Sequence, residues 1–149
     1  MSPKELVRKE RILDYLDNIE RQIEDIQSIH VDGKEFFLDR KNFIQIKAIK
    51  YSLACAIQDV TRISAHLASA LSLWKVRESE AEAILALSHA GILPKKFAEK
   101  IKGMPAFRNR IIQDYLPNEF DALKLFENIQ RLDDFRKFAK YILKWLETN

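Results

Sequence analysis

Apolar residues recur at helical intervals along most of the chain. Near the N-terminus their spacings are 4, 3, 4 and 3, which trace one stripe along an amphipathic helix that we expect to end near His30. The stripe consists of Ile12, Leu16, Ile19, Ile23 and Ile26. A second long helix is predicted from near Asp39 to about Leu73. Its buried side is expected to carry Ile46, Ile49, Leu53, Ala56, Ile57, Val60, Ile63 and Leu67.

Start and stop signals mark the shorter helices that follow. Ser79 and Glu82 form a capping-box pattern, in which the Ser side chain caps the helix and the Glu lies three residues later. Gly91 suits the left-handed position after the end of this helix. Pro94 suits the first turn of the next one.

The C-terminal half continues with further helices. The helix that begins at Pro94 is expected to bend or break at residues 103–105, which read Gly-Met-Pro. A short helix should then run from residue 106 to about 115, followed by another over about 119–131. Asp133 is predicted to cap a last helix.

These patterns predict an all-α protein, because no segment alternates as a strand does. We expect an up-and-down helical bundle with two long N-terminal helices and several shorter ones, forming a single domain over residues 1–149. A single cysteine, Cys55, excludes an intramolecular disulfide and favours a reducing cytoplasm. It lies in an apolar run, which predicts a buried structural thiol. No signal peptide is evident, and no run approaches the ~20 apolar residues of a membrane span.

The charge of the chain is informative about function in one stretch only. The net charge of +3 is too small to indicate a nucleic-acid-binding protein by itself. Between Pro94 and Arg110, however, basic residues outnumber acids by six to one. The basic residues are Lys95, Lys96, Lys100, Lys102, Arg108 and Arg110, and the acid is Glu99. The run is either a solvated helix face or a surface for a polyanion.

Other chemistry is sparsely represented. No spaced cluster of His, Cys and Asp predicts a metal site, and there is no Gly-rich phosphate loop or serine nucleophile motif. We therefore expect no metal and no cofactor. His66, on the second long helix, is interpreted as a hydrogen-bonded interior histidine in preference to a catalyst.

One stretch carries a recognisable signature. Residues 107–115 read Phe-Arg-Asn-Arg-Ile-Ile-Gln-Asp-Tyr. They resemble the Arg-x4-His-x-Tyr signature of HEPN-domain ribonuclease toxins, specifically the HepT-like group. Arg108, Asn109 and Tyr115 are in register, whereas Gln113 stands where the signature has its His.

The resemblance covers nearly the whole chain. Residues 56–67 look like the group's second-helix signature, and blocks at 90–94, 102–109 and 132–135 follow in the group's order and spacing. Two acids of the second-helix signature are replaced. Gln58 stands at the position of its opening Glu and Arg62 at that of its mid-helix acid, which leaves open how charges around the site are paired.

The resemblance implies a metal-independent endoribonuclease whose site forms where two protomers meet. In that family the His transfers protons and the Arg binds phosphate. Arg108 can bind a phosphate through its planar fork, Asn109 can orient a neighbouring group, and Gln113 cannot exchange a proton near neutral pH. Loss of acid–base catalysis typically costs about 10²–10⁴-fold in rate. The chain is therefore expected to bind RNA, with Lys102 and Arg110 assisting Arg108, and to cleave it poorly.

Helix geometry bears on the same residues. On an ideal helix Arg108 and Gln113 project about 140° apart. One straight helix would not direct both at one phosphate, which favours a homodimer or a loosened helix end. Arg108 alternatively pairs with an acid and has only a structural role. Natural degeneration and a deliberate inactivating change both account for Gln113, since His and Gln codons differ by one base.

The resemblance also implies a partner. In HepT-like systems of the type VII toxin–antitoxin class, a minimal nucleotidyltransferase (MNT) acts as the antitoxin and transfers AMP onto the motif Tyr, which here is Tyr115. Added phosphate beside Arg108 would exclude an RNA phosphate from the same place. Two alternatives remain: a non-catalytic, substrate-binding partner of a nucleotidyltransferase, which Gln113 favours, and a helical adaptor that uses the fold alone.

Overall fold

The computed structural model describes residues 6–113 and 116–149. Its α-helices are α1 Lys9–Gln27, α2 Phe43–Ala70, α3 Glu80–His89, α4 Lys95–Ile101, α5 Met104–Ile111, α6 Glu119–Ile129 and α7 Asp133–Thr148. Two 3-10 helices, η2 Lys34–Leu38 and η3 Arg40–Asn42, lie between α1 and α2. No strand occurs in these residues, and the predicted all-α fold class is confirmed.

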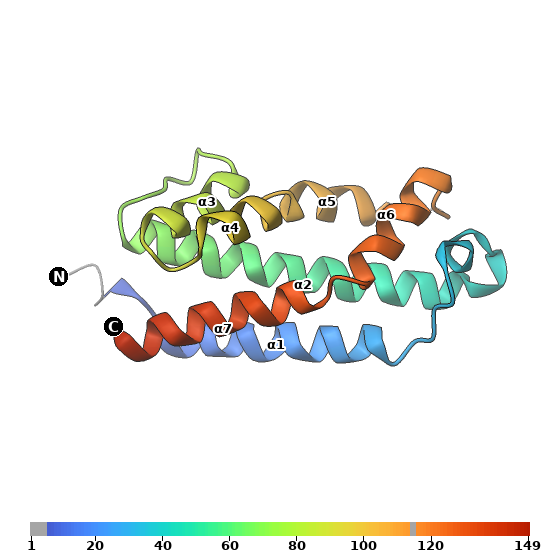
Figure 1. Cartoon of the computed structure of the whole chain (residues 1–149), viewed down its shortest axis with the longest axis horizontal. Helices are drawn as coiled ribbons and strands as arrows, with labels where there is room; N and C mark the ends of the chain where they lie inside the picture. Colours follow the sequence, from blue (N-terminus) through green and yellow to red (C-terminus); the bar gives the residue numbers. More distant parts are fainter. Residues whose placement is uncertain (1–5, 114–115) are drawn as a thin grey trace.

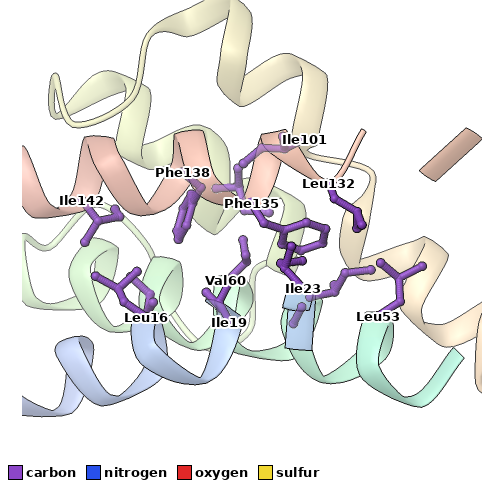
Figure 2. Close-up of a cluster of buried hydrophobic side chains, with 14 of the residues drawn as sticks. Leu16, Ile19, Ile23, Leu53, Val60, Ile101, Leu132, Phe135, Phe138 and Ile142 are labelled. Atoms are coloured by element: carbon purple, nitrogen blue, oxygen red, sulfur yellow. The ribbon is translucent and has the colours of Figure 1, made fainter. Parts of the chain in front are cut away.

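Helix α2 is the central element of the bundle. Helices α1 and α7 pack along one side of it, and α3, α4 and α5 follow one another along the opposite side (Figure 1). Side chains from the first side meet in the core shown in Figure 2, where Phe135 and Phe138 of α7 lie over Ile19 of α1 and Val60 of α2. Because α2 is covered on both sides, more than half of its residues are buried.

The stripe predicted on the first helix is buried along its whole length, with no member more than 6% exposed. The predicted helix ends were less accurate. Helix α1 ends at Gln27, before His30. Helix α2 begins at Phe43, because residues 40–42 form a 3-10 turn in which the Asp39 side chain accepts a hydrogen bond from the backbone N–H of Lys41 at 2.9 Å. It ends at Ala70, and Ser72 then adopts a left-handed conformation with φ of 60°.

The predictions of a Ser79 cap and of a left-handed Gly91 are confirmed, whereas Pro94 lies one residue before the first turn predicted for it. The Ser79 side chain accepts a hydrogen bond from the backbone N–H of Glu82 at 3.2 Å and thereby caps α3. Gly91 has φ of 75°, the left-handed conformation that glycine adopts at little cost. Pro94 is the N-cap of α4. The predicted break near Gly103 separates α4 from α5.

The remaining elements lie close to their predicted places. Helix α6 spans Glu119–Ile129, and Asn118 caps it by accepting a hydrogen bond from the Asp121 N–H at 2.8 Å. Asp133 is the first residue of α7, so its predicted place as the cap was wrong by one residue. No helix in the described ranges is long and apolar enough to cross a membrane.

Candidate functional site

The signature lies on α5 and on the segment that follows it. Pro105 in the first turn suits the start of this helix, since its missing N–H would have no helical partner there. Helix α5 packs against α2. The last helical residue is Ile111 and the C-cap is Ile112, so the helix predicted to reach about residue 115 ends earlier. Gln113 therefore lies beyond the helix, which is the loosened end considered from the sequence. Tyr115 lies outside the described residues.

Arg108 is held by side chains from three helices. Its Nη2 donates to Glu80 Oε1 at 2.8 Å and its Nη1 to Glu80 Oε2 at 3.4 Å, which makes a two-pronged contact with α3. Nη1 also donates to Gln58 Oε1 of α2 at 2.9 Å. Nε and Nη2 donate to Asn109 Oδ1 at 3.3 and 3.1 Å. The side chain of Arg108 is only 13% exposed, so the guanidinium lies at the base of this cluster.

Glu80 is the residue at this site that the sequence reasoning missed. Glu80 lies between the two residues of the predicted capping box, in the first turn of α3, where an acid interacts favourably with the helix dipole. The available signal was the replacement of the acids expected at Gln58 and Arg62, since it left Arg108 without a carboxylate from α2. The pairing of Arg108 with an acid, one of the two alternatives for this residue, is confirmed.

Gln113 is anchored at a different point of α2. Its backbone carbonyl accepts a hydrogen bond from Nζ of Lys50, whose side chain is largely buried. Beside it is an open pocket of about 310 Å³. The pocket is lined by Phe43, Ile46, Lys47, Lys50, Tyr51, Ala54, Ile111, Ile112 and Gln113. A hydrogen bond with Cys55 raises the pKa of Tyr51 above its ordinary value of 10.

Signature positions 108 and 113 contact α2 at two well-separated points. Arg108 binds Gln58, whereas the residue 113 carbonyl binds Lys50, eight positions earlier (58 − 50 = 8). At 1.5 Å per residue this separation is about 12 Å along the helix axis. The structure therefore brings Arg108 and Asn109 together and anchors Gln113 elsewhere along the same helix.

The basic run does not form one uniform surface. Lys102 pairs with Glu99 on its own stretch of chain at 2.7 Å, and hydrogen bonding to Lys102 lowers the pKa of Glu99. Arg110 pairs with Asp121 of α6 at 2.6 Å and lies over the Phe120 ring. Lys100 pairs with Asp134 at 2.9 Å. Three members besides Arg108 are thus neutralised by acids, so the solvated-face interpretation describes them better than a single polyanion surface does.

Two other expectations are settled by the structure. His66 is half-buried, and its Nε2 accepts a hydrogen bond from the backbone N–H of Arg8 at 3.0 Å, which confirms a hydrogen-bonded histidine. Cys55 is partly exposed, so the prediction of a fully buried thiol was wrong. Cys55 lies about one helical turn from Tyr51, which is exposed, so this side of α2 is open to solvent. Among the residues described, no group of three or more His, Cys, Asp or Glu could hold a metal ion.

Comparison with known proteins assigns the chain to a family. A family model described as "Ribonuclease HepT-like" matches residues 19–142. The chain belongs to the HepT-like ribonuclease family. The match extends from α1 into α7 and includes all the residues that hold Arg108. No curated protein matches the sequence significantly.

Solved structures share the fold of this HepT-like chain. A tri-AMPylated Shewanella oneidensis HEPN toxin, solved in complex with an MNT antitoxin, is 22% identical with a TM-score of 0.74. The alignment covers 89% of this chain and 96% of that one. A mutant toxin–antitoxin pair, MntA–HpeT, gives 22% identity, a TM-score of 0.75 and coverage of 89% and 97%. A toxin–antitoxin complex with AMP-PNP is 21% identical with a TM-score of 0.71, and the alignment covers 89% of this chain and 97% of that one. At this level of identity the likeness shows the HEPN fold.

Proposed function

We propose that this protein is the toxin component of a toxin–antitoxin pair, that it binds RNA through Arg108, and that Gln113 impairs its cleavage of RNA. The observation that carries the proposal is the environment of Arg108. Its guanidinium fork is held at a defined place by Glu80, Gln58 and Asn109, and such a planar fork binds a phosphate in the same two-pronged way as a carboxylate. The HepT-like family and the toxins among its structural neighbours supply the class of activity.

The chemistry of RNA cleavage identifies the function that Gln113 cannot supply, which is proton transfer. In metal-independent cleavage the 2′-oxygen attacks phosphorus, the bond to the 5′-oxygen breaks, and the products are a 2′,3′-cyclic phosphate and a 5′-hydroxyl. A base must take the 2′ proton, an acid must protonate the 5′-oxygen, and positive charge must stabilise the phosphorane-like centre. Arg108 supplies the charge. Gln113 has no group that titrates near neutral pH, so the proton transfers lose their catalyst.

The separation of the two signature positions supports a homodimer. Because Arg108 and Gln113 are anchored about 12 Å apart along α2, a site shared by two copies places them together more readily than one copy does. Ile112 and Tyr51, both beside the pocket at Gln113, are 62% and 70% exposed. Apolar groups with this exposure are suited to contact a second copy of the chain.

We further propose that a cognate MNT-type nucleotidyltransferase neutralises the protein by adding AMP to Tyr115. Among the structural neighbours, one HEPN toxin is tri-AMPylated and was solved with an MNT antitoxin, and another structure is the MntA–HpeT toxin–antitoxin pair. The sequence retains the Tyr of the signature at position 115. AMP phosphates near Arg108 would compete with an RNA phosphate for the same guanidinium.

A second candidate function is a non-catalytic, substrate-binding subunit of the nucleotidyltransferase. Gln113 favours it, because the chain retains the modifiable Tyr and lacks the proton-transfer residue. The two functions differ in what Arg108 does. The toxin requires Arg108 for RNA binding, whereas the binding subunit requires only that Tyr115 be presented to the enzyme.

The test combines RNA binding with mass spectrometry. Binding of a short fluorescent single-stranded RNA is measured for the wild-type protein and for Arg108→Ala, with Arg77→Ala as a matched control on the exposed α2–α3 loop. The proposal expects weaker binding, and a shallower salt dependence by about 0.7 per lost phosphate contact, only for Arg108→Ala. Incubation with the nucleotidyltransferase and ATP should add AMP to the wild type and not to Tyr115→Phe. AMP addition without any RNA binding would favour the second candidate.

A further inference from the structure

Every N–H donor of Arg108 is already used within the chain. A guanidinium has five such donors. The structure gives them five hydrogen bonds, with one from Nε, two from Nη1 and two from Nη2. Two of the five go to the carboxylate of Glu80, one to each oxygen. A phosphate can therefore be bound by the fork of Arg108 only if an internal partner is released.

Among these partners, Glu80 is the one that competes most directly with a phosphate. A carboxylate and a phosphate bind the guanidinium fork in the same two-pronged way, and both are anionic. Gln58 and Asn109 accept hydrogen bonds without carrying charge. Like-charge repulsion from Glu80 therefore opposes the approach of a phosphate, whereas the two amides do not.

Glu80 is also more accessible to water than Arg108. Its side chain is 40% exposed, against 13% for Arg108, so water can solvate the carboxylate when it leaves the guanidinium. It lies in the first turn of α3, where the helix dipole favours a negative charge with or without Arg108. The N-terminus of this helix also has its own cap, because the Ser79 side chain accepts a hydrogen bond from the backbone N–H of Glu82.

We infer that Glu80 is an internal competitor that occupies the phosphate-binding fork of Arg108 in the free protein and is displaced when an RNA phosphate binds. The inference rests on the proposed RNA-binding function. It assigns Glu80, which the signature does not include, as a residue that sets the affinity of the site. Gln58, where the group's second-helix signature has a Glu, supplies no charge, so Glu80 is the carboxylate that neutralises Arg108 in this chain.

The experiment measures the affinity for the same short single-stranded RNA in Glu80→Gln and in Glu82→Gln. The control removes the same charge from the same turn of α3, because the Glu82 side chain is exposed and its contact with Ser79 is made by its backbone. Because the Glu80 carboxylate is partly exposed, its pair with Arg108 is modest in strength, and Glu80→Gln should tighten RNA binding by about two- to fivefold, with no such change in Glu82→Gln. Gln58→Glu places a second carboxylate beside Arg108, this one from α2, and should weaken RNA binding.

Combination with Arg108→Ala makes the inference specific. In that background Glu80→Gln should change RNA affinity no more than Glu82→Gln does, because the guanidinium for which Glu80 competes is absent. An equal gain from both glutamate substitutions would indicate a general charge effect and overturn the inference. If Arg108→Ala weakens binding but Glu80→Gln leaves it unchanged, the inference fails while the proposed function stands. If Arg108→Ala itself has no effect, the proposed RNA contact of Arg108 fails.

Discussion

Lys50 of α2 donates a hydrogen bond to the backbone carbonyl of Gln113, directly after the end of α5. The last carbonyls of a helix lack partners within the helix, and a cation near them also interacts favourably with the dipole. Lys50 is only 9% exposed, so this contact is made largely away from water. It fixes the backbone at the position where the signature has its His.

Substitution Lys50→Met should therefore destabilise the protein. We expect the free energy of unfolding in urea to fall by about 1.5–3 kcal/mol, the usual range for a hydrogen bond to a charged group. Lys140→Met, at an exposed position of α7, is the control and should change it little. Equal stability of the two variants would show that Lys50 does not anchor residue 113.

The proposed dimer predicts a specific effect at Ile112. Replacing this exposed apolar residue by Asp places a charge next to the pocket at Gln113 and should shift the protein from dimer to monomer. Sedimentation equilibrium at several protein concentrations measures the shift. Val76→Asp, at a still more exposed apolar position on the α2–α3 loop, should leave the dimer intact. A monomeric wild type, or a dimer that tolerates Ile112→Asp, would contradict the arrangement.

His66 predicts a dependence of stability on pH. Burial lowers the pKa of His66 below its ordinary value of 6.5, and the charges of Arg11 and Arg8 lower it further. The folded protein favours the neutral ring, because only neutral Nε2 can accept the hydrogen bond from the Arg8 N–H. This contribution to stability is complete above pH 6.5, the ordinary pKa, and is lost as the pH falls through the lower pKa of the folded state.

Urea unfolding between pH 7 and pH 5 measures this loss, within the range where histidine titrates. We expect the wild type to lose more stability over this interval than His66→Gln, whose side chain does not titrate there. His89→Gln removes an exposed histidine and is the control, with a pH dependence like that of the wild type. Identical profiles for all three proteins would rule out the contribution of His66.

The helices were predictable because their apolar spacing, caps and breakers act locally. The stripe from Ile12 to Ile26, the Ser79 cap and the left-handed Gly91 each follow from residues within one or two turns. The 3-10 helix η2 was missed, since its one fully buried side chain, Phe37, is buried through contacts with distant elements such as α6. The end of α5 was misplaced for a similar reason, because the Lys50 contact that holds the next residues comes from another helix.

The candidate site was only partly predictable. The resemblance identified Arg108, Asn109 and Gln113 along one stretch of sequence. It could not identify Glu80, which is 28 residues from Arg108 and reaches it only because α3 and α5 both pack on α2. Nor could it show that Arg110 pairs with Asp121, since the two residues meet across helices, whereas the Lys102–Glu99 pair is local.

Restoration of the signature histidine tests the central claim most directly. In Gln113→His the residue regains a side chain that transfers protons near neutral pH. We predict that this variant cleaves single-stranded RNA about 10²–10⁴-fold faster than the wild type, leaving 2′,3′-cyclic phosphate ends, and that adding Arg108→Ala abolishes the gain. A folded Gln113→His protein that binds RNA but cleaves it no faster than the wild type would contradict the account.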